Sequence, residues 1–205
     1  YGAQLFEFNN VVFKRPVVAA QENDQYVVVG ISKHKAHYDI NVTSHDKGNP
    51  EANRENMSCQ VQLIDEYERT KVFDVDGFIA HCDNVIDLVD VYGLAHSNGI
   101  EHHAFMKTNG KVYLSEQQEL MEISLSQSAE AFREKFYIHP AFLDSATFAG
   151  TALLLNALSQ NTNAERTPYI PFVIEKIRLN GAFPETIYVH TNLAQQSENK
   201  SDKSD

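Results

Sequence analysis

One stretch, residues 136–158, constrains the fold more than any other part of this sequence. It reads FYIHPAFLDSATFAGTALLLNAL, and after Pro140 its apolar and small residues recur at intervals of three and four. That spacing is the period of a helix buried along one broad face. Proline suits the first turn of a helix, because the N–H that it lacks would have no intrahelical partner there. The stretch therefore predicts a long buried helix that begins at Pro140.

A single carboxylate, Asp144, lies near the start of this otherwise almost uncharged helix. One interpretation makes it a helix-start carboxylate, stabilised by free backbone N–H groups and by the positive end of the helix dipole. The other makes it a general acid whose pKa is raised by apolar neighbours such as Phe142, Leu143 and Phe148. The spacing of the residues alone does not decide between these two interpretations of Asp144.

Composition restricts the functional classes. With 205 residues, 42% of them hydrophobic, the chain can form one large core or two small fused cores. A formal net charge of -11 argues against nucleic-acid binding, which needs basic groups to neutralise phosphates. No apolar run is long enough to span a bilayer, and two cysteines indicate neither a disulfide framework nor a zinc site. We therefore expect a cytoplasmic protein with no membrane or nucleic-acid partner.

The order of elements along the chain is that of an α+β protein. Runs rich in β-branched and aromatic residues predict strands at residues 5–18, 26–31, 37–42, 58–64, 104–108, 111–114, 120–125, 170–179 and 187–191. Residues 44–56 are polar and predict a loop. Apolar residues return to helical spacing over 78–94, and the Asn109-Gly110 pair predicts a tight hairpin turn.

Several segments resemble polyketide synthase dehydratase domains in order and spacing. HPAFLDSA, residues 139–146, resembles the active-site motif of the second half of such a domain. GIEHHAF, residues 99–105, resembles the family's Gly-Ile-x-Tyr-Gly-Pro-x-Phe segment, and residues 169–179 resemble its Leu-Pro-Phe-x-Ile-Glu-x-Val-x-Leu strand. FKRPVV, residues 13–18, is similar to the late part of the first half.

This resemblance implies an α+β double-hotdog fold, in which a curved antiparallel sheet wraps around a long central helix and the first hotdog is incomplete. The expected parts are the remainder of the first hotdog (1–76), a linking helix (77–98), the second hotdog half (99–193) and a polar tail (194–205). It also implies that Asp144 is the acid that helps remove water from β-hydroxyacyl chains. Such chains are carried on the phosphopantetheine of an acyl carrier protein, so we expect no other cofactor and no metal. The carrier protein and neighbouring synthase domains are the expected partners, and unpaired sheet edges are compatible with a homodimer.

The chain also departs from the family pattern. The family's catalytic base is a histidine in a His-x-x-x-Gly-x-x-x-x-Pro motif, and no histidine of this chain has that context. Phe148 stands four residues after Asp144, where the family often has a glutamine or histidine that hydrogen-bonds to the carboxylate. Because dehydration needs a base as well as an acid, we expect little or no turnover from this chain alone. Two alternatives stay open: a non-catalytic pseudo-dehydratase that serves as a scaffold or docking element, and a product-template-like cyclase.

Several histidines and neighbouring apolar residues are further candidates for site residues. The candidates for a substrate tunnel are His102, His103, Phe105, His139, Phe148 and Pro171. Adjacent side chains of a strand point to opposite faces, so only one of His102 and His103 could enter a tunnel and supply the missing base. His34, His37 and Asp39 have a spacing that could suit a metal. Strand geometry would turn residues three apart to opposite faces, so a solvated polar edge is the favoured interpretation there.

Overall fold

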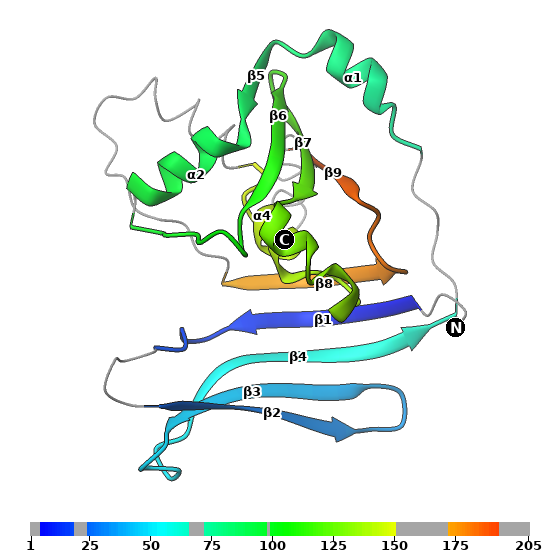
Figure 1. Ribbon diagram of the computed structural model, residues 1–205. Helices are drawn as coiled ribbons and strands as arrows, with labels where there is room; N and C mark the ends of the chain where they lie inside the picture. Colours follow the sequence, from blue (N-terminus) through cyan, green and yellow to red (C-terminus); the bar gives the residue numbers. More distant parts are fainter. Residues whose placement is uncertain (1–4, 19–23, 66–71, 98, 151–171, 193–205) are drawn as a thin grey trace, which may run out of the picture. The chain divides into compact units, whose positions relative to one another are not determined.

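The computed structural model describes residues 5–18, 24–65, 72–97, 99–150 and 172–192 (Figure 1). The chain forms two compact units, of which the first combines residues 1–70 with 170–181 and the second combines 71–169 with 182–205. The described part of each unit contains one sheet, and all neighbouring strands in both sheets are antiparallel. None of the described helices has the length and apolar character that crossing a bilayer would require.

The first unit is built on a five-stranded sheet with the order β2-β3-β4-β1-β8 (Figure 1). Its strands are β1 (Leu5–Phe13), β2 (Gln25–Lys33), β3 (Tyr38–Asp46), β4 (Arg54–Ile64) and β8 (Val173–Asn180). Val11, Cys59 and Val61 are its buried apolar centre. Strand β8 comes from late in the sequence and pairs with β1, with Phe8 opposite Ile177. The described part of this unit contains strands and no helix, as expected for an incomplete first hotdog.

The second unit packs helices on a four-stranded sheet with the order β5-β6-β7-β9. The strands are β5 (Asn84–Asp87), β6 (Thr108–Leu114), β7 (Gln118–Leu125) and β9 (Thr186–Asn192). The helical segments are α1 (Val75–His81), α2 (Leu88–Ser97), α3 (Gln127–Glu130), a 3-10 turn (Arg133–Lys135) and α4 (Pro140–Ala146). Helix α2 contacts β6, and α4 contacts both β6 and β7. The resulting core contains Leu88, Val91, Tyr92, Val112, Leu114, Met121, Ile123, Leu125, Ala129, Ala141 and Phe142.

Several local expectations differ from this arrangement. The single linking helix expected over residues 77–98 is two helices separated by β5, whose residues pair with β6. The strand predicted at residues 104–108 is wrong, because residues 104–106 form a turn and β6 begins at Thr108. The polar loop predicted at residues 44–56 is shorter, since β3 continues to Asp46 and β4 starts at Arg54. At residues 84–87 and at both ends of 44–56, strand pairing overrides the local pattern, whereas residues 104–106 form a turn despite their apolar pattern.

The hairpin prediction at Asn109-Gly110 is also wrong, because both residues lie inside β6. The reversal occurs after β6, where Ser115 N donates a 2.9 Å hydrogen bond to the carbonyl of Gln118. Gly110 has φ 151°, and a Cβ atom added there would lie 1.8 Å from the carbonyl oxygen of Glu122 on β7. The glycine is therefore required by the close approach of two strands rather than by a turn.

Helix α4 begins at Pro140 as predicted, and His139 caps it by accepting a 3.2 Å hydrogen bond from Ala141 N. It ends at Ala146, and a turn leads to Gly150, which has φ 87°. A residue in this left-handed region is a common way to end a helix. The prediction of an unbroken helix is therefore wrong at residues 147–150, and the rest of its span, residues 151–158, lies outside the described residues.

Candidate active site

The carboxylate of Asp144 is positioned by the way α4 packs. Ala141, Phe142 and Ser145 are buried, and this helix contacts β6 and β7. Asp144 follows the buried Ala141 by three residues and is itself half-buried, so it stands at the edge of the buried face of α4. Its side chain is 34% exposed, which leaves one part of the carboxylate open and one part covered.

The covered side of the carboxylate faces an imidazole. Nε2 of His102 lies 3.1 Å from Oδ2 of Asp144, and the His102 side chain is only 8% exposed. Within the described residues this Oδ2 accepts no well-aligned hydrogen bond, so the contact is a close ion pair of poor hydrogen-bond geometry. Burial raises the pKa of Asp144 above its ordinary value, while the charge of His102 and its contact with the carboxylate oppose that rise.

Two aromatic rings hold His102 in place. The ring centroids of Tyr92 and Phe148 each lie 5.1 Å from that of His102, and the two aromatic rings lie 5.7 Å from each other. Phe148 packs edge-on against His102 and has no polar atom to offer Asp144. Among the described residues, the side chain shown beside the carboxylate of Asp144 is thus the imidazole of His102, while Phe148, four residues after Asp144, packs on that imidazole.

Three hydroxyl groups form a buried network directly behind Asp144. The Tyr92 hydroxyl lies 2.9 Å from Ser145 Oγ and 3.1 Å from Thr108 Oγ1, and the last two atoms are 2.8 Å apart. The Tyr92 hydroxyl also accepts a 3.0 Å hydrogen bond from Thr108 N. These bonds join α2, β6 and α4, so they fix the helix that carries Asp144. Sequence reasoning missed this network, and its one local signal was a serine on the buried stripe of α4.

The other predicted tunnel residues are divided between two places. His102 and His103 both line an open cavity of about 660 Å³ beside α2. The expectation that only one of them could enter a shared space is therefore wrong, because neither residue lies in a strand. Asp144 is not among the described residues that line this cavity. His139 lines a separate cavity of about 710 Å³ together with Phe136, Phe142 and Phe183.

Phe105 belongs to the surroundings of His139, since the two ring centroids lie 4.9 Å apart. The Nε2 atom of His139 has no hydrogen-bond partner among the described residues, and burial lowers the pKa of this histidine. Pro171 lies outside the described residues. The structure thus brings His102 to Asp144 and packs Phe148 against His102, while the tunnel roles of all six residues stay predictions.

Comparisons with family models and with known protein sequences both relate this chain to polyketide synthases. The model of the polyketide synthase dehydratase N-terminal domain matches residues 73–205, more than half of the chain. The polyketide synthases PksL and PksN of Bacillus subtilis (strain 168) are 26% and 22% identical over 183 and 195 residues, or 85% and 95% of this chain. Those matches span only 4% and 3% of the two synthases, so the similarity concerns one small part of each.

Solved structures match as well. An N-terminal dehydratase from the difficidin assembly line is 36% identical, with a TM-score of 0.79 over 92% of this chain and 63% of that chain. The dehydratase domain from the CurK module of curacin polyketide synthase is 18% identical, and its TM-score of 0.77 shows a likeness in fold. This chain therefore spans less than two thirds of the difficidin dehydratase. The α+β hotdog fold is confirmed by these neighbours, and the chain belongs to the polyketide synthase dehydratase family.

Proposed function

We propose that this domain descends from, or forms part of, an enzyme that removes water from β-hydroxyacyl chains, with Asp144 as the general acid. The observation that carries the proposal is the partly buried Asp144, in contact with a buried imidazole, at the position of the family's acidic residue. The acyl chain would be held on the phosphopantetheine of an acyl carrier protein in the cytoplasm. The similarity to polyketide synthases supports association with neighbouring domains of such a synthase.

The environment of Asp144 suits proton donation to a leaving hydroxyl. Burial raises its pKa, so more of the carboxyl group stays protonated than at an exposed aspartate. His102 acts in the opposite direction, because a cationic imidazole 3.1 Å away favours the carboxylate form. Burial is the larger of the two influences, so the pKa of Asp144 stays above its ordinary value.

Dehydration by this chain would also require a catalytic base that acts together with Asp144. The sequence lacks the His-x-x-x-Gly-x-x-x-x-Pro motif in which the family carries its catalytic histidine. Two structures of the CurK dehydratase are inactive mutants, one with phenylalanine in place of a histidine and one with asparagine in place of an aspartate. Removing one member of an acid-base pair lowers the rate by a factor of roughly a hundred to ten thousand. We infer that the chain alone turns over a β-hydroxyacyl thioester slowly or not at all.

A non-catalytic role within a synthase is the second candidate. It is favoured by Phe148, whose ring packs against His102 where a hydrogen-bonding side chain would assist Asp144 in the family pattern. A pseudo-dehydratase of this kind would hold neighbouring domains and perform no chemistry. The reading frame that surrounds this chain distinguishes the enzyme from the non-catalytic scaffold. A His-x-x-x-Gly-x-x-x-x-Pro motif within a domain's length before Tyr1 favours the enzyme, and its absence favours the scaffold.

The direct test is an assay of the purified chain with a β-hydroxyacyl thioester of a phosphopantetheine mimic. We expect no turnover above the uncatalysed rate, and none with Asp144→Asn. Asp90→Asn, at an exposed position on α2, is the matched control. Clear turnover that Asp144→Asn abolishes and Asp90→Asn preserves would show that this chain contains its own base, which would overturn the inference of little or no turnover.

A further inference from the structure

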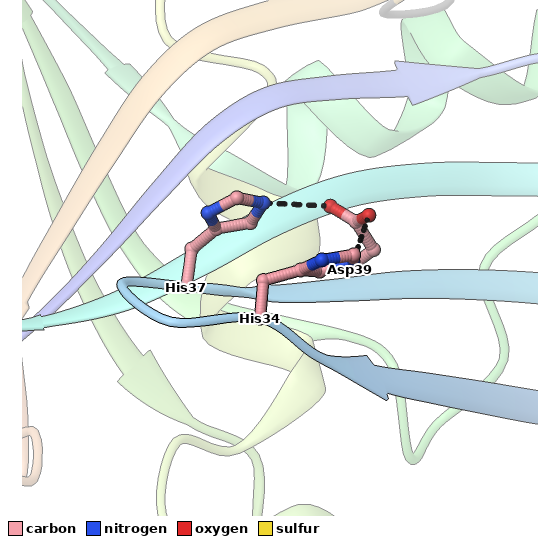
Figure 2. A group of neighbouring side chains, drawn as sticks. All are labelled: His34, His37 and Asp39. Carbon is pink, nitrogen blue, oxygen red and sulfur yellow. Dashed lines mark ion pairs between the residues drawn. The ribbon is translucent and has the colours of Figure 1, made fainter.

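The tip of the β2-β3 hairpin brings together two imidazoles and a carboxylate (Figure 2). Nε2 of His34 lies 2.9 Å from one carboxylate oxygen of Asp39, and Nε2 of His37 lies 3.3 Å from the other. One potential ligand atom from each of the three residues lies within 4.8 Å of both others. The expectation that these side chains would face apart is therefore wrong.

The reason is that His34 and His37 flank a turn instead of lying along a strand. Strand β2 ends at Lys33 and β3 begins at Tyr38, and these two residues are the last pair of the ladder. His34 N donates a 2.9 Å hydrogen bond to the carbonyl of His37, which closes the turn. Both imidazoles consequently lie on one side, with their ring centroids 4.8 Å apart and their planes 19° from parallel.

We propose that His34, His37 and Asp39 form a binding site for a divalent transition-metal cation, with Zn²⁺ as the representative ion. Two imidazole nitrogens and one carboxylate oxygen are ligands that suit zinc, nickel and copper. Ligand atoms bound at about 2.0–2.1 Å to a tetrahedral ion lie roughly 3.3 Å from one another. The two nitrogen-oxygen separations are close to that value, one to each carboxylate oxygen of Asp39. To bind one ion together, the two imidazoles and the carboxylate have to shift, and these partly exposed side chains at the hairpin tip can do so.

Two further features support a cation at this place. With both imidazoles neutral, the three side chains carry one net negative charge, which attracts a divalent ion. Gln60 Nε2 donates a 3.2 Å hydrogen bond to Oδ1 of Asp39, so the carboxylate is oriented by a residue of the neighbouring strand β4. Bonds of this kind commonly hold metal-binding carboxylates in place. Three protein ligands would leave at least one coordination position for water or for another molecule.

The alternative is a plain ion-pair cluster in which Asp39 contacts protonated histidines and no metal binds. Isothermal titration of the full 205-residue chain, without an affinity tag, with ZnCl₂ distinguishes the two. We expect saturable binding of one Zn²⁺ per chain, and a loss of affinity of at least tenfold in each of His34→Ala, His37→Ala and Asp39→Asn. These residues are exposed or half-buried, so the variants should keep the fold, which circular dichroism checks.

Control variants are needed because the chain has nine histidines. His96→Ala is one control, since His96 is exposed and contacts only Glu101, at 3.5 Å, among the acidic side chains of the described residues. His45→Ala is the second, because His45 lies in β3 and stacks on Tyr26. Both should bind Zn²⁺ as the unaltered chain does. Absence of saturable binding, or binding that survives His37→Ala and is lost in a control, would overturn the proposal.

Co²⁺ gives an independent readout, since coordinated nitrogen ligands alter its visible absorption. We expect a visible band on addition of Co²⁺ that disappears in His34→Ala and His37→Ala and stays in His96→Ala. A Co²⁺ spectrum identical to that of the hydrated ion would also count against the site. The hairpin lies wholly in the first unit, so these outcomes are independent of Asp144 and of any dehydratase activity.

Discussion

In the second unit the imidazole of His102 stands 3.1 Å from the carboxylate of Asp144, although the two residues come from different segments of the chain. Aromatic rings on two sides of His102 leave the imidazole little freedom to turn away. Burial raises the pKa of Asp144, and the contact with His102 acts in the opposite direction. The acidity of the residue is therefore set by tertiary contacts that can be removed one at a time.

Replacing His102 by glutamine should raise the pKa of Asp144 further. The substitution removes the charge that favours the carboxylate form and leaves the desolvation that disfavours it. A pH titration of the Asp144 carboxyl carbon by NMR measures the change. His96→Gln, at an exposed position, should leave the titration unaltered. An unchanged or lowered pKa in His102→Gln would mean that the two side chains do not interact as described.

Asp144→Asn should stabilise the chain at neutral pH. A carboxyl whose pKa is higher in the folded state than its ordinary value of 3.8 favours folding at low pH, and this contribution is lost as pH rises through the folded-state pKa. Above that value the ionised, partly buried group opposes folding, and asparagine removes the penalty. Urea unfolding should show the variant to be more stable at pH 7, with a smaller difference at pH 5. Asp90→Asn should show no such pH-dependent gain.

Ser145→Ala should destabilise the second unit by about 1–3 kcal/mol. The change removes one member of the buried hydroxyl network and leaves the hydroxyls of Tyr92 and Thr108 one partner short. Because Ser145 is fully buried, water cannot replace the lost bond easily. Chemical denaturation measures the loss of unfolding free energy. Ser97→Ala at the exposed end of α2 is the matched control, and an equal loss there would contradict a specific role for the network.

Gly110→Ala should disrupt the pairing of β6 and β7. The new Cβ atom would lie 1.8 Å from the backbone carbonyl of Glu122, and the residue would also have to keep φ 151°. Overpacking and backbone strain of this kind cost about 1–3 kcal/mol each. A lower thermal midpoint is the expected result. Gly48→Ala, where a Cβ would meet no atom within 4 Å, should leave the midpoint nearly unchanged.

The first unit should lose stability in acid through Glu7. This carboxylate is 6% exposed, and it accepts hydrogen bonds from Arg178 Nε at 2.7 Å, Gln62 Nε2 at 2.9 Å and Asn9 Nδ2 at 3.1 Å. These bonds, that of Arg178 above all, lower its pKa from 4.5 to about 2. A lowered pKa stabilises the folded state above pH 4.5, and the contribution disappears as pH falls from 4.5 to about 2.

Glu7→Gln checks this expectation by unfolding experiments between neutral pH and acid. The variant should be less stable than the unaltered chain at pH 7 and should show a shallower loss of stability below pH 4.5. Glu55→Gln removes an exposed carboxylate that contacts Lys14 at 2.6 Å, so it should change stability little. A pH profile of Glu7→Gln that parallels the unaltered chain would contradict the assignment.

Local patterns were sufficient for the regular parts of this protein. Most strands were found within a few residues, because alternating or β-branched runs are visible in the sequence itself. The start of α4 was found at Pro140 for a similar reason, since proline and the apolar spacing act within one turn. The same reasoning failed at Asn109-Gly110, because it cannot distinguish a glycine needed for a turn from one needed where β6 approaches β7.

Periodicity in the sequence placed Asp144 at the start of a buried helix, and the resemblance of its motifs to polyketide synthase dehydratases indicated the family and the hotdog fold. The surroundings of that carboxylate and the convergence of the histidines became visible in the folded chain alone. His102 reaches Asp144, and His34 reaches Asp39 together with His37, through strand ends and turns whose directions are set by long-range pairing and packing. Which side chains meet depends on the residue at which the backbone reverses direction. Moving that reversal by one residue turns the following side chains to the opposite face of the strand.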